Sequence, residues 1–199
     1  LAPKSIASEL RRLYLQKGKL GAIYSLEAAK NPEYDQTFLF SIAKSLGITS
    51  GPYAATFEQE TISDLFSEQA ILCSALPYIS LKCFNLLIAK GMPKELAYLE
   101  CWYEMKLIAD TLVEMGPEKF FALISPTAFI GSDLAKDELY GKQFDLALEK
   151  IMENVMNGNF FKQEAKVDFQ QRRQEVINMW KQETLTKTHE ELKASLFGK

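Results

Sequence analysis

Two pairs of carboxylates, Asp64 with Glu68 and Glu100 with Glu104, each stand four residues apart within apolar helical patterns. Residues four apart share one face of a helix, so each pair sets two like charges side by side, at a cost of roughly 0.2–0.5 kcal/mol. Apolar surroundings raise that cost, so such carboxylates are expected to be protonated, paired with a basic residue or bound to a cation. Oxygen ligands alone favour a hard cation, Mg²⁺ before Mn²⁺ or Ca²⁺. Together the pairs predict a magnesium site, with ordinary helix decoration as the alternative for either pair alone.

The rest of the chain offers few other catalytic groups. His189 is its single histidine, and the charged sequence around it predicts a solvated side chain. The sequence contains no glycine-rich phosphate-binding loop, no nucleophile elbow and no HExxH motif. Any chemistry is therefore expected to rest on carboxylates, lysines and hydroxyls.

The elements that must position the carboxylates are helices. From residue 58 onward, proline and glycine separate long segments of helical apolar periodicity, which predicts an all-helical region. Its predicted helices are 62–76, 78–90, 93–115, 117–124, 136–157 and 163–196. The preceding residues alternate instead, with helices predicted over 6–16 and 33–45 and strands over 22–26 and 53–57. The predicted fold class is mainly α, with an α/β region at 1–57 and an all-helical domain at 58–199.

Composition narrows the class of protein. The chain of 199 residues is 47% hydrophobic and has a net charge of −3 without a basic stripe, so nucleic acid is an unexpected partner. Polar residues and a proline interrupt the apolar stretch 70–92, so no membrane span is expected. The three cysteines lack CxxC spacing, which favours free buried thiols and a cytoplasmic location. They are Cys73, Cys83 and Cys101.

Several segments resemble one enzyme family in order along the chain. TFEQETISDLFSEQAILC at 56–73 resembles the opening of the C-terminal domain of ketol-acid reductoisomerases, and 91–116 resembles that domain's second metal-site helix. ISPTAFIG at 124–131 is similar to the family's substrate-contacting loop, and NGNFFK with ELKASL is similar to the closing helices of the short form. APK at 2–4 resembles the strand end that supplies an active-site lysine. The resemblance thus covers nearly the whole chain.

The resemblance implies a role for each carboxylate. Asp64 matches an aspartate that bridges two Mg²⁺ ions, and Glu68 matches a glutamate that binds one of them. Glu60 matches an outer, catalytic carboxylate of the same network. Glu100 and Glu104 match an acidic pair that the other subunit contributes, largely through metal-bound water and the substrate, so Glu104 counts as both a metal and a catalytic residue.

The resemblance also implies the reaction. Ser125 matches the serine that hydrogen-bonds the substrate carboxylate, and Lys4 matches a catalytic lysine near the metals' water shell. The substrate is expected to be a 2-hydroxy-2-alkyl-3-keto acid such as 2-acetolactate, which undergoes Mg²⁺-dependent alkyl migration and then reduction by NADPH in valine and isoleucine biosynthesis. Taken alone, Ser125 would be read as a helix cap and Lys4 as a surface lysine.

The resemblance further implies a knotted helical dimerisation domain, hence a homodimer or a higher even oligomer, preceded by the α/β tail of a Rossmann domain. The glycine fingerprint that would bind NADPH is absent from these 199 residues. We therefore expect a metal-site portion that is inactive in reduction by itself.

The sequence departs from the family where it reads Ser5-Ile6-Ala7-Ser8 after Lys4, and also at Ser67, Tyr103, Pro126 and Phe129-Ile130. These changes leave two alternatives open. One is a non-catalytic paralogue that keeps the fold and acts as a helical dimerisation module. The other is a structural interaction module that binds no metal.

Overall fold

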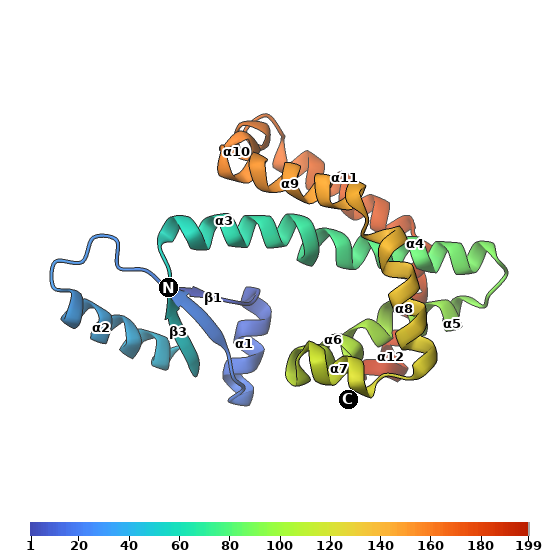
Figure 1. The fold of residues 1–199 in the computed structure, drawn as a ribbon, viewed down its shortest axis with the longest axis horizontal. Helices are drawn as coiled ribbons and strands as arrows, with labels where there is room; N and C mark the ends of the chain where they lie inside the picture. Colours follow the sequence, from blue (N-terminus) through green and yellow to red (C-terminus); the bar gives the residue numbers. More distant parts are fainter. Residues whose placement is uncertain (199) are drawn as a thin grey trace. The chain divides into compact units, whose positions relative to one another are not determined.

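The computed structural model describes residues 1–198 of the chain. They form two compact units, Leu1–Phe66 and a second unit that begins at Ser67, and Figure 1 labels most of their helices and strands. The first unit thus includes most of the first helix of the helical pattern, Phe57–Ser67. The domain boundary predicted between residues 57 and 58 stays a prediction. Each unit is described by itself.

The first unit is built on a three-stranded sheet of order β1-β2-β3. Its strands are β1 (Ala2–Pro3), β2 (Gly21–Tyr24) and β3 (Ser50–Ala54). β1 runs antiparallel to β2, and β2 runs parallel to β3. Two parallel neighbours need a crossover connection, which the helix between them provides.

Three helices complete the first unit: α1 (Ala7–Gln16), α2 (Pro32–Ser45) and α3 (Phe57–Ser67). The sequence favours the start of α2, because the Asn31 side chain accepts a hydrogen bond from the Tyr34 N–H and proline occupies the first helical position. A small core lies between this helix and the sheet. It contains Leu20, Ala22, Ala43 and Ile48, with Leu10 and Leu13 packed against it.

The second unit is helical throughout its described residues (Figure 1). Its elements are η1 (Glu68–Ala75), α4 (Leu76–Ala89), α5 (Lys94–Tyr98), η2 (Leu99–Tyr103), α6 (Glu104–Met115), α7 (Pro117–Leu123), α8 (Pro126–Leu139), α9 (Lys142–Met156), α10 (Asn159–Glu164), α11 (Phe169–Gln182) and α12 (Thr184–Phe197). η1 and η2 are π-helical, with wider turns than an α-helix. The core joins α4, α5 and α12 through Leu81, Phe84, Ala97, Tyr98 and Leu185.

The mainly α fold class is confirmed, and several predicted boundaries are wrong. The strand predicted at 53–57 ends at Ala54, because Phe57 already begins α3. The long helix predicted at 163–196 is three helices, since Asp168 and Glu183 have extended backbone. The helix predicted at 136–157 is divided between α8 and α9 near Gly141.

The prediction of a solvated histidine is also wrong. His189 is half-buried, and its Nδ1 lies 2.7 Å from the hydroxyl of the fully buried Tyr98. Tyr98 needs a polar partner because a buried hydroxyl without a hydrogen bond is costly. His189 therefore joins α12 to α5 as part of the packing of the second unit.

The cysteines are free, as predicted, but they are not buried within this chain. Cys73 and Cys83 are exposed, and Cys101 is half-buried. Burial is the main cause that raises the pKa of the Cys101 thiol.

One helical stretch among the described residues, Phe57–Ala89, has the length and apolar composition that a membrane span requires. Most of its side chains are not buried in the chain. The sequence analysis predicted a break between two helices here, and not one uninterrupted helix of 33 residues. The helix continues through Pro77 because this residue lies in the first turn of α4, where a missing N–H is tolerated. A single stretch of this kind is weak support for a membrane protein, because a helix that packs in a soluble protein can pass the same test.

Candidate metal centre

Lys4 and two carboxylates of α3 form an ionic cluster in the first unit. The Lys4 Nζ lies 2.7 Å from Glu60 Oε1 and 3.0 Å from Asp64 Oδ1. Lys4 directly follows β1, and its backbone N–H donates to the Gly21 carbonyl at 3.0 Å, which fixes the lysine to the sheet. Glu60 and Asp64 are four residues apart on one helix, so both can reach one cation.

The two carboxylates shift the protonation equilibrium of Lys4. Burial by itself lowers the pKa of Lys4, but the hydrogen bonds from Nζ to Glu60 and then Asp64, together with their charges, outweigh that effect. The net pKa of Lys4 is raised, so the ammonium form is favoured. Two negative oxygens are thus already aimed at a shared positive charge.

The chemistry of this pair fits Mg²⁺. Magnesium prefers oxygen ligands and is commonly held by one or two carboxylates, with water and substrate oxygens completing an octahedron. The ammonium of Lys4 shows that Glu60 and Asp64 present oxygens toward a common cation. Within residues 1–198, no three side chains of His, Cys, Asp or Glu come together closely enough to hold a metal ion. One chain therefore offers a two-carboxylate start of a site.

Side-chain oxygens accept hydrogen bonds from the backbone N–H groups at the start of α3. Thr56 Oγ1 accepts from the Gln59 N–H at 3.0 Å, and Gln59 Oε1 accepts from the Thr56 N–H at 3.0 Å, which forms a reciprocal capping box. Glu27 Oε1 accepts from the Phe57 N–H at 2.6 Å. Our sequence analysis missed Glu27, because its contact depends on a residue thirty positions away.

Glu68 opens the π-helix η1 immediately after α3, and its side chain is exposed. The second predicted metal motif also coincides with a π-helix, since Glu100 lies in η2 and Glu104 is the first residue of α6. π-Helical turns are rare and often occur at functional sites. Both motifs were predicted as regular α-helix, which is wrong at these turns.

The surroundings of the second pair differ from our expectation. Glu100 and Glu104 are exposed, not buried among apolar groups. Some of their apolar neighbours are exposed as well, with Leu107 at 47% and Ile108 at 44% of their full accessibility, whereas Trp102 is half-buried against the core. In one chain, these carboxylates and apolar side chains share an uncovered surface.

Ser125 caps the N-terminus of α8. Its Oγ accepts a hydrogen bond of 3.2 Å from the Ala128 N–H, with proline at the first helical position. Capping the helix is a structural role for Ser125. The residue is also exposed, so a ligand can reach it. Substrate binding by Ser125 stays a prediction.

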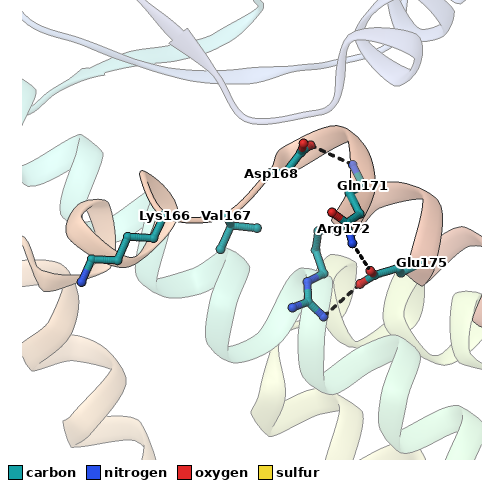
Figure 2. A pocket seen from close by; sticks show the side chains of 6 residues that line it. All are labelled: Lys166, Val167, Asp168, Gln171, Arg172 and Glu175. Carbon is teal, nitrogen blue, oxygen red and sulfur yellow. Dashed lines mark hydrogen bonds and ion pairs between the residues drawn. The ribbon is translucent and has the colours of Figure 1, made fainter.

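A charged hollow of about 180 Å³ lies elsewhere in the second unit, at the start of α11 (Figure 2). Its lining is internally paired: Asp168 accepts from the Gln171 N–H, the Gln171 amide donates to Glu175, and Arg172 lies 3.3 Å from Glu175. None of the predicted site residues lines it. It is therefore a set of capping and ion-pair contacts.

Comparison with known proteins supports the same segments. Residues 57–196 match the family model described as ketol-acid reductoisomerase, C-terminal domain. The chain is 37% identical over 163 residues to the ketol-acid reductoisomerase (NADP(+)) of Helicobacter pylori (strain ATCC 700392 / 26695), covering 81% of this chain and 49% of that protein. It is 36% identical over 166 residues to the protein of that name in Petrotoga mobilis, with the same coverage.

A solved structure resembles the whole chain. The NADH-preferring ketol-acid reductoisomerase from an uncultured archean superposes with a TM-score of 0.84 at 28% identity, covering 100% of this chain and 60% of that one. The chain belongs to the ketol-acid reductoisomerase family. It spans about half the length of the curated relatives that it matches.

Proposed function

We propose that this chain is the metal- and substrate-binding part of a ketol-acid reductoisomerase. The observation that carries the proposal is the cluster in which Lys4 joins Glu60 and Asp64, because both carboxylates lie at the beginning of the segment that matches the family model. The proposed substrate is a 2-hydroxy-2-alkyl-3-keto acid such as 2-acetolactate, on the pathway to valine and isoleucine.

Two Mg²⁺ ions, when bound, would polarise the substrate's carbonyl and stabilise its alkoxide during alkyl migration. Asp64 and Glu68 are the proposed direct ligands. Glu60 would orient water in the same network, and Lys4 would hold or release a proton beside it. Their oxygen and ammonium groups supply what this chemistry needs without a histidine.

The remaining roles concern the substrate and the nicotinamide cofactor. The Ser125 hydroxyl is proposed to donate a hydrogen bond to the substrate carboxylate while still accepting its cap bond. NADPH is the proposed reductant, by analogy with the names of the curated relatives. Its pyrophosphate would bind outside these 199 residues, which contain no glycine-rich fingerprint.

A second copy of the chain is the proposed cover for the exposed helices. Large apolar side chains remain open to solvent on η1, η2 and α6, where the predicted metal carboxylates also lie. Many large exposed apolar side chains are typical of an interface. In the homodimer, Glu100 and Glu104 would complete the partner's site. This arrangement would also cover the apolar stretch Phe57–Ala89 with protein in place of lipid.

A cytoplasmic location is proposed from the cysteines. All three thiols are free, and two of them are exposed. Free thiols persist in reducing compartments, whereas oxidising compartments favour disulfides.

The proposal is tested with the full product of the gene, purified and supplied with Mg²⁺, NADPH and 2-acetolactate. We expect steady NADPH oxidation that requires both metal and substrate. Asp64→Asn should abolish it, and Asp133→Asn, on an exposed helix with its own lysine partner, should not. Mg²⁺ binding without turnover would instead favour the paralogue, and absence of Mg²⁺ binding would favour the structural module.

A further inference from the structure

Glu27 connects the sheet of the first unit to the first turn of α3. It lies three residues after β2, near the carboxyl end of the parallel pair β2 and β3. Its Oε1 accepts the 2.6 Å hydrogen bond from the Phe57 N–H and a second hydrogen bond from the Ser25 hydroxyl. Phe57 is the first residue of α3, so this contact ties the helix start to the sheet.

This contact differs from an ordinary helix cap. The capping box of Thr56 and Gln59 already satisfies N–H groups at the start of α3 with residues of the same turn. Such a local cap favours helix formation but does not determine where the helix lies. Glu27 helps to fix where α3 lies, because it comes from a different part of the chain, thirty residues earlier.

Two anchors therefore hold α3 within the first unit. Glu27 holds its first residue, and Lys4 holds Glu60 and Asp64 further along the helix. Glu27 follows β2 and Lys4 follows β1, so both anchors lie in segments that leave the strands of the sheet. Two points of attachment fix the position of a helix along its axis and its rotation about that axis.

We infer that Glu27 is a positioning residue for the metal carboxylates of α3, an assignment that rests on the magnesium site proposed above. Advancing a helix by one residue turns its side chains by about 100° and moves them about 1.5 Å along the axis. Metal–ligand distances tolerate only about 0.2 Å. The anchor at Phe57 thus controls whether Asp64 reaches the metal ion and whether Glu60 reaches the water beside it.

The test measures Mg²⁺ affinity calorimetrically in the full product of the gene. Glu27→Ala removes the acceptor and should weaken Mg²⁺ binding about tenfold, as loss of an outer residue that orients ligands commonly does. Glu27→Gln keeps a carbonyl oxygen and should stay within about threefold of the parent. The matched control is Glu33→Ala, which removes an exposed acidic side chain from the first turn of α2.

A second readout follows the backbone itself. Hydrogen exchange at the Phe57 amide should accelerate in Glu27→Ala and not in Glu33→Ala, because only the first variant loses that amide's acceptor. A Glu27→Ala protein with lower thermal stability but unchanged Mg²⁺ affinity would overturn the inference, since the residue would then be structural only. Equal effects of both alanine variants would overturn it too.

If the Glu27→Ala protein does not fold, the Ser25→Ala variant tests the inference in its place. It leaves the Glu27 carboxylate in place and removes the hydroxyl that orients it, so Mg²⁺ affinity should fall about threefold. Unchanged affinity would overturn the inference. A parent protein that binds no Mg²⁺ would overturn the proposed magnesium site itself, whereas binding by the parent with no response in these variants overturns only the role of Glu27.

Discussion

The starts of α3 and α6 carry acidic residues at similar spacing but differ in how the chain supports them. On α3, Glu60 and Asp64 already share the ammonium of Lys4, and the Glu60 side chain is only 18% exposed. On η2 and α6, Glu100 and Glu104 are exposed and form no hydrogen bond or ion pair within residues 1–198. Equal spacing in sequence therefore does not imply equal preorganisation.

The difference teaches which part of the site one chain can build alone. The α3 carboxylates face a cation that the same unit supplies, so their geometry is set before a metal binds. The α6 carboxylates stand among exposed apolar groups, including Leu107 and Ile108. An exposed apolar surface of this kind is typical of an interaction site, so the proposed role of these carboxylates includes a second copy of the chain. The predictions below test this contrast, from the largest expected effect to the smallest.

The largest effect is expected from neutralising Asp64, one of the carboxylates of α3 that already share the ammonium of Lys4. Asp64→Asn should weaken Mg²⁺ binding by about 100-fold or more, whereas Glu104→Gln should weaken it by about tenfold, because Glu104 is assigned a largely water-mediated role. Calorimetric titration of the full gene product measures both.

The control for this pair is Asp133→Asn, which removes an exposed carboxylate of α8. Its Mg²⁺ affinity should match the parent. Equal losses in Asp64→Asn and Glu104→Gln would erase the contrast between the two regions.

The next effect concerns the uncovered surface of α6. Ile108→Asp should weaken self-association about 30-fold, since a central interface residue commonly contributes about 2 kcal/mol. Sedimentation over a concentration series measures the dissociation constant. Gln174→Asp adds the same charge to the polar, exposed helix α11 and should leave association unchanged. Similar association of Ile108→Asp and the parent would place the interface elsewhere.

The sequence predicted helices well where the apolar period is long and uninterrupted. It predicted α1, α2, α4 and α7 to within about two residues, since each has a clear start or stop signal such as Pro32 or Gly116. It failed at Asp168 and Glu183, where no proline or glycine marks the break. It also gave no sign of the π-helical turns, because their wider hydrogen bonding depends on packing.

The residues of the candidate site were likewise predicted only in part from the sequence. The resemblance predicted one site for Lys4, Glu60 and Asp64, and in the first unit Lys4 forms ion pairs with both carboxylates. Their roles in metal binding and catalysis stay a prediction. Glu27 was missed because a hydrogen bond across thirty residues has no period or motif. The exposure of Glu100 and Glu104 was also missed, because apolar neighbours in sequence indicate burial without saying which molecule provides the cover.

A smaller effect is expected from removing the cation that the α3 carboxylates share. Lys4→Gln should tighten Mg²⁺ binding about threefold to tenfold, because the ammonium no longer repels the metal or occupies the same oxygens, while the Glu27 anchor still holds the start of α3. The metal-free variant should be less stable than the parent, since Glu60 and Asp64 then repel each other without compensation.

Calorimetry and thermal unfolding in chelator measure these two quantities. Lys19→Gln removes an exposed lysine of the same unit and should change neither. Weaker Mg²⁺ binding in Lys4→Gln would show that the lysine supports the metal geometry and does not compete with the metal.

The smallest effect is a pH dependence of the two anchors of α3, measured without metal. The hydrogen bond from the Phe57 N–H, and then that from Ser25, lower the pKa of Glu27 below its usual 4.5. Its contribution to stability is therefore complete above pH 4.5 and is lost as the pH falls through the lowered value in the folded protein. The pKa of Lys4 is raised above 10.5, so its contribution is complete below pH 10.5 and is lost as the pH rises through that higher value.

Urea unfolding of the parent, Glu27→Gln and Lys4→Gln in chelator separates the two anchors, because each midpoint reports stability directly. The gap between the parent and Glu27→Gln should be constant from pH 5 to 8 and should close as the pH falls below 4.5 through the lowered pKa of Glu27, because the parent's carboxylate then becomes neutral as well. The gap between the parent and Lys4→Gln should be constant at neutral pH and should close as the pH rises above 10.5, through the raised pKa of Lys4. A Glu27 gap that persists at the lowest pH at which the parent stays folded would show that the ionised carboxylate is not what holds Phe57, and α3 would then rely on its local capping box and Lys4 for its position.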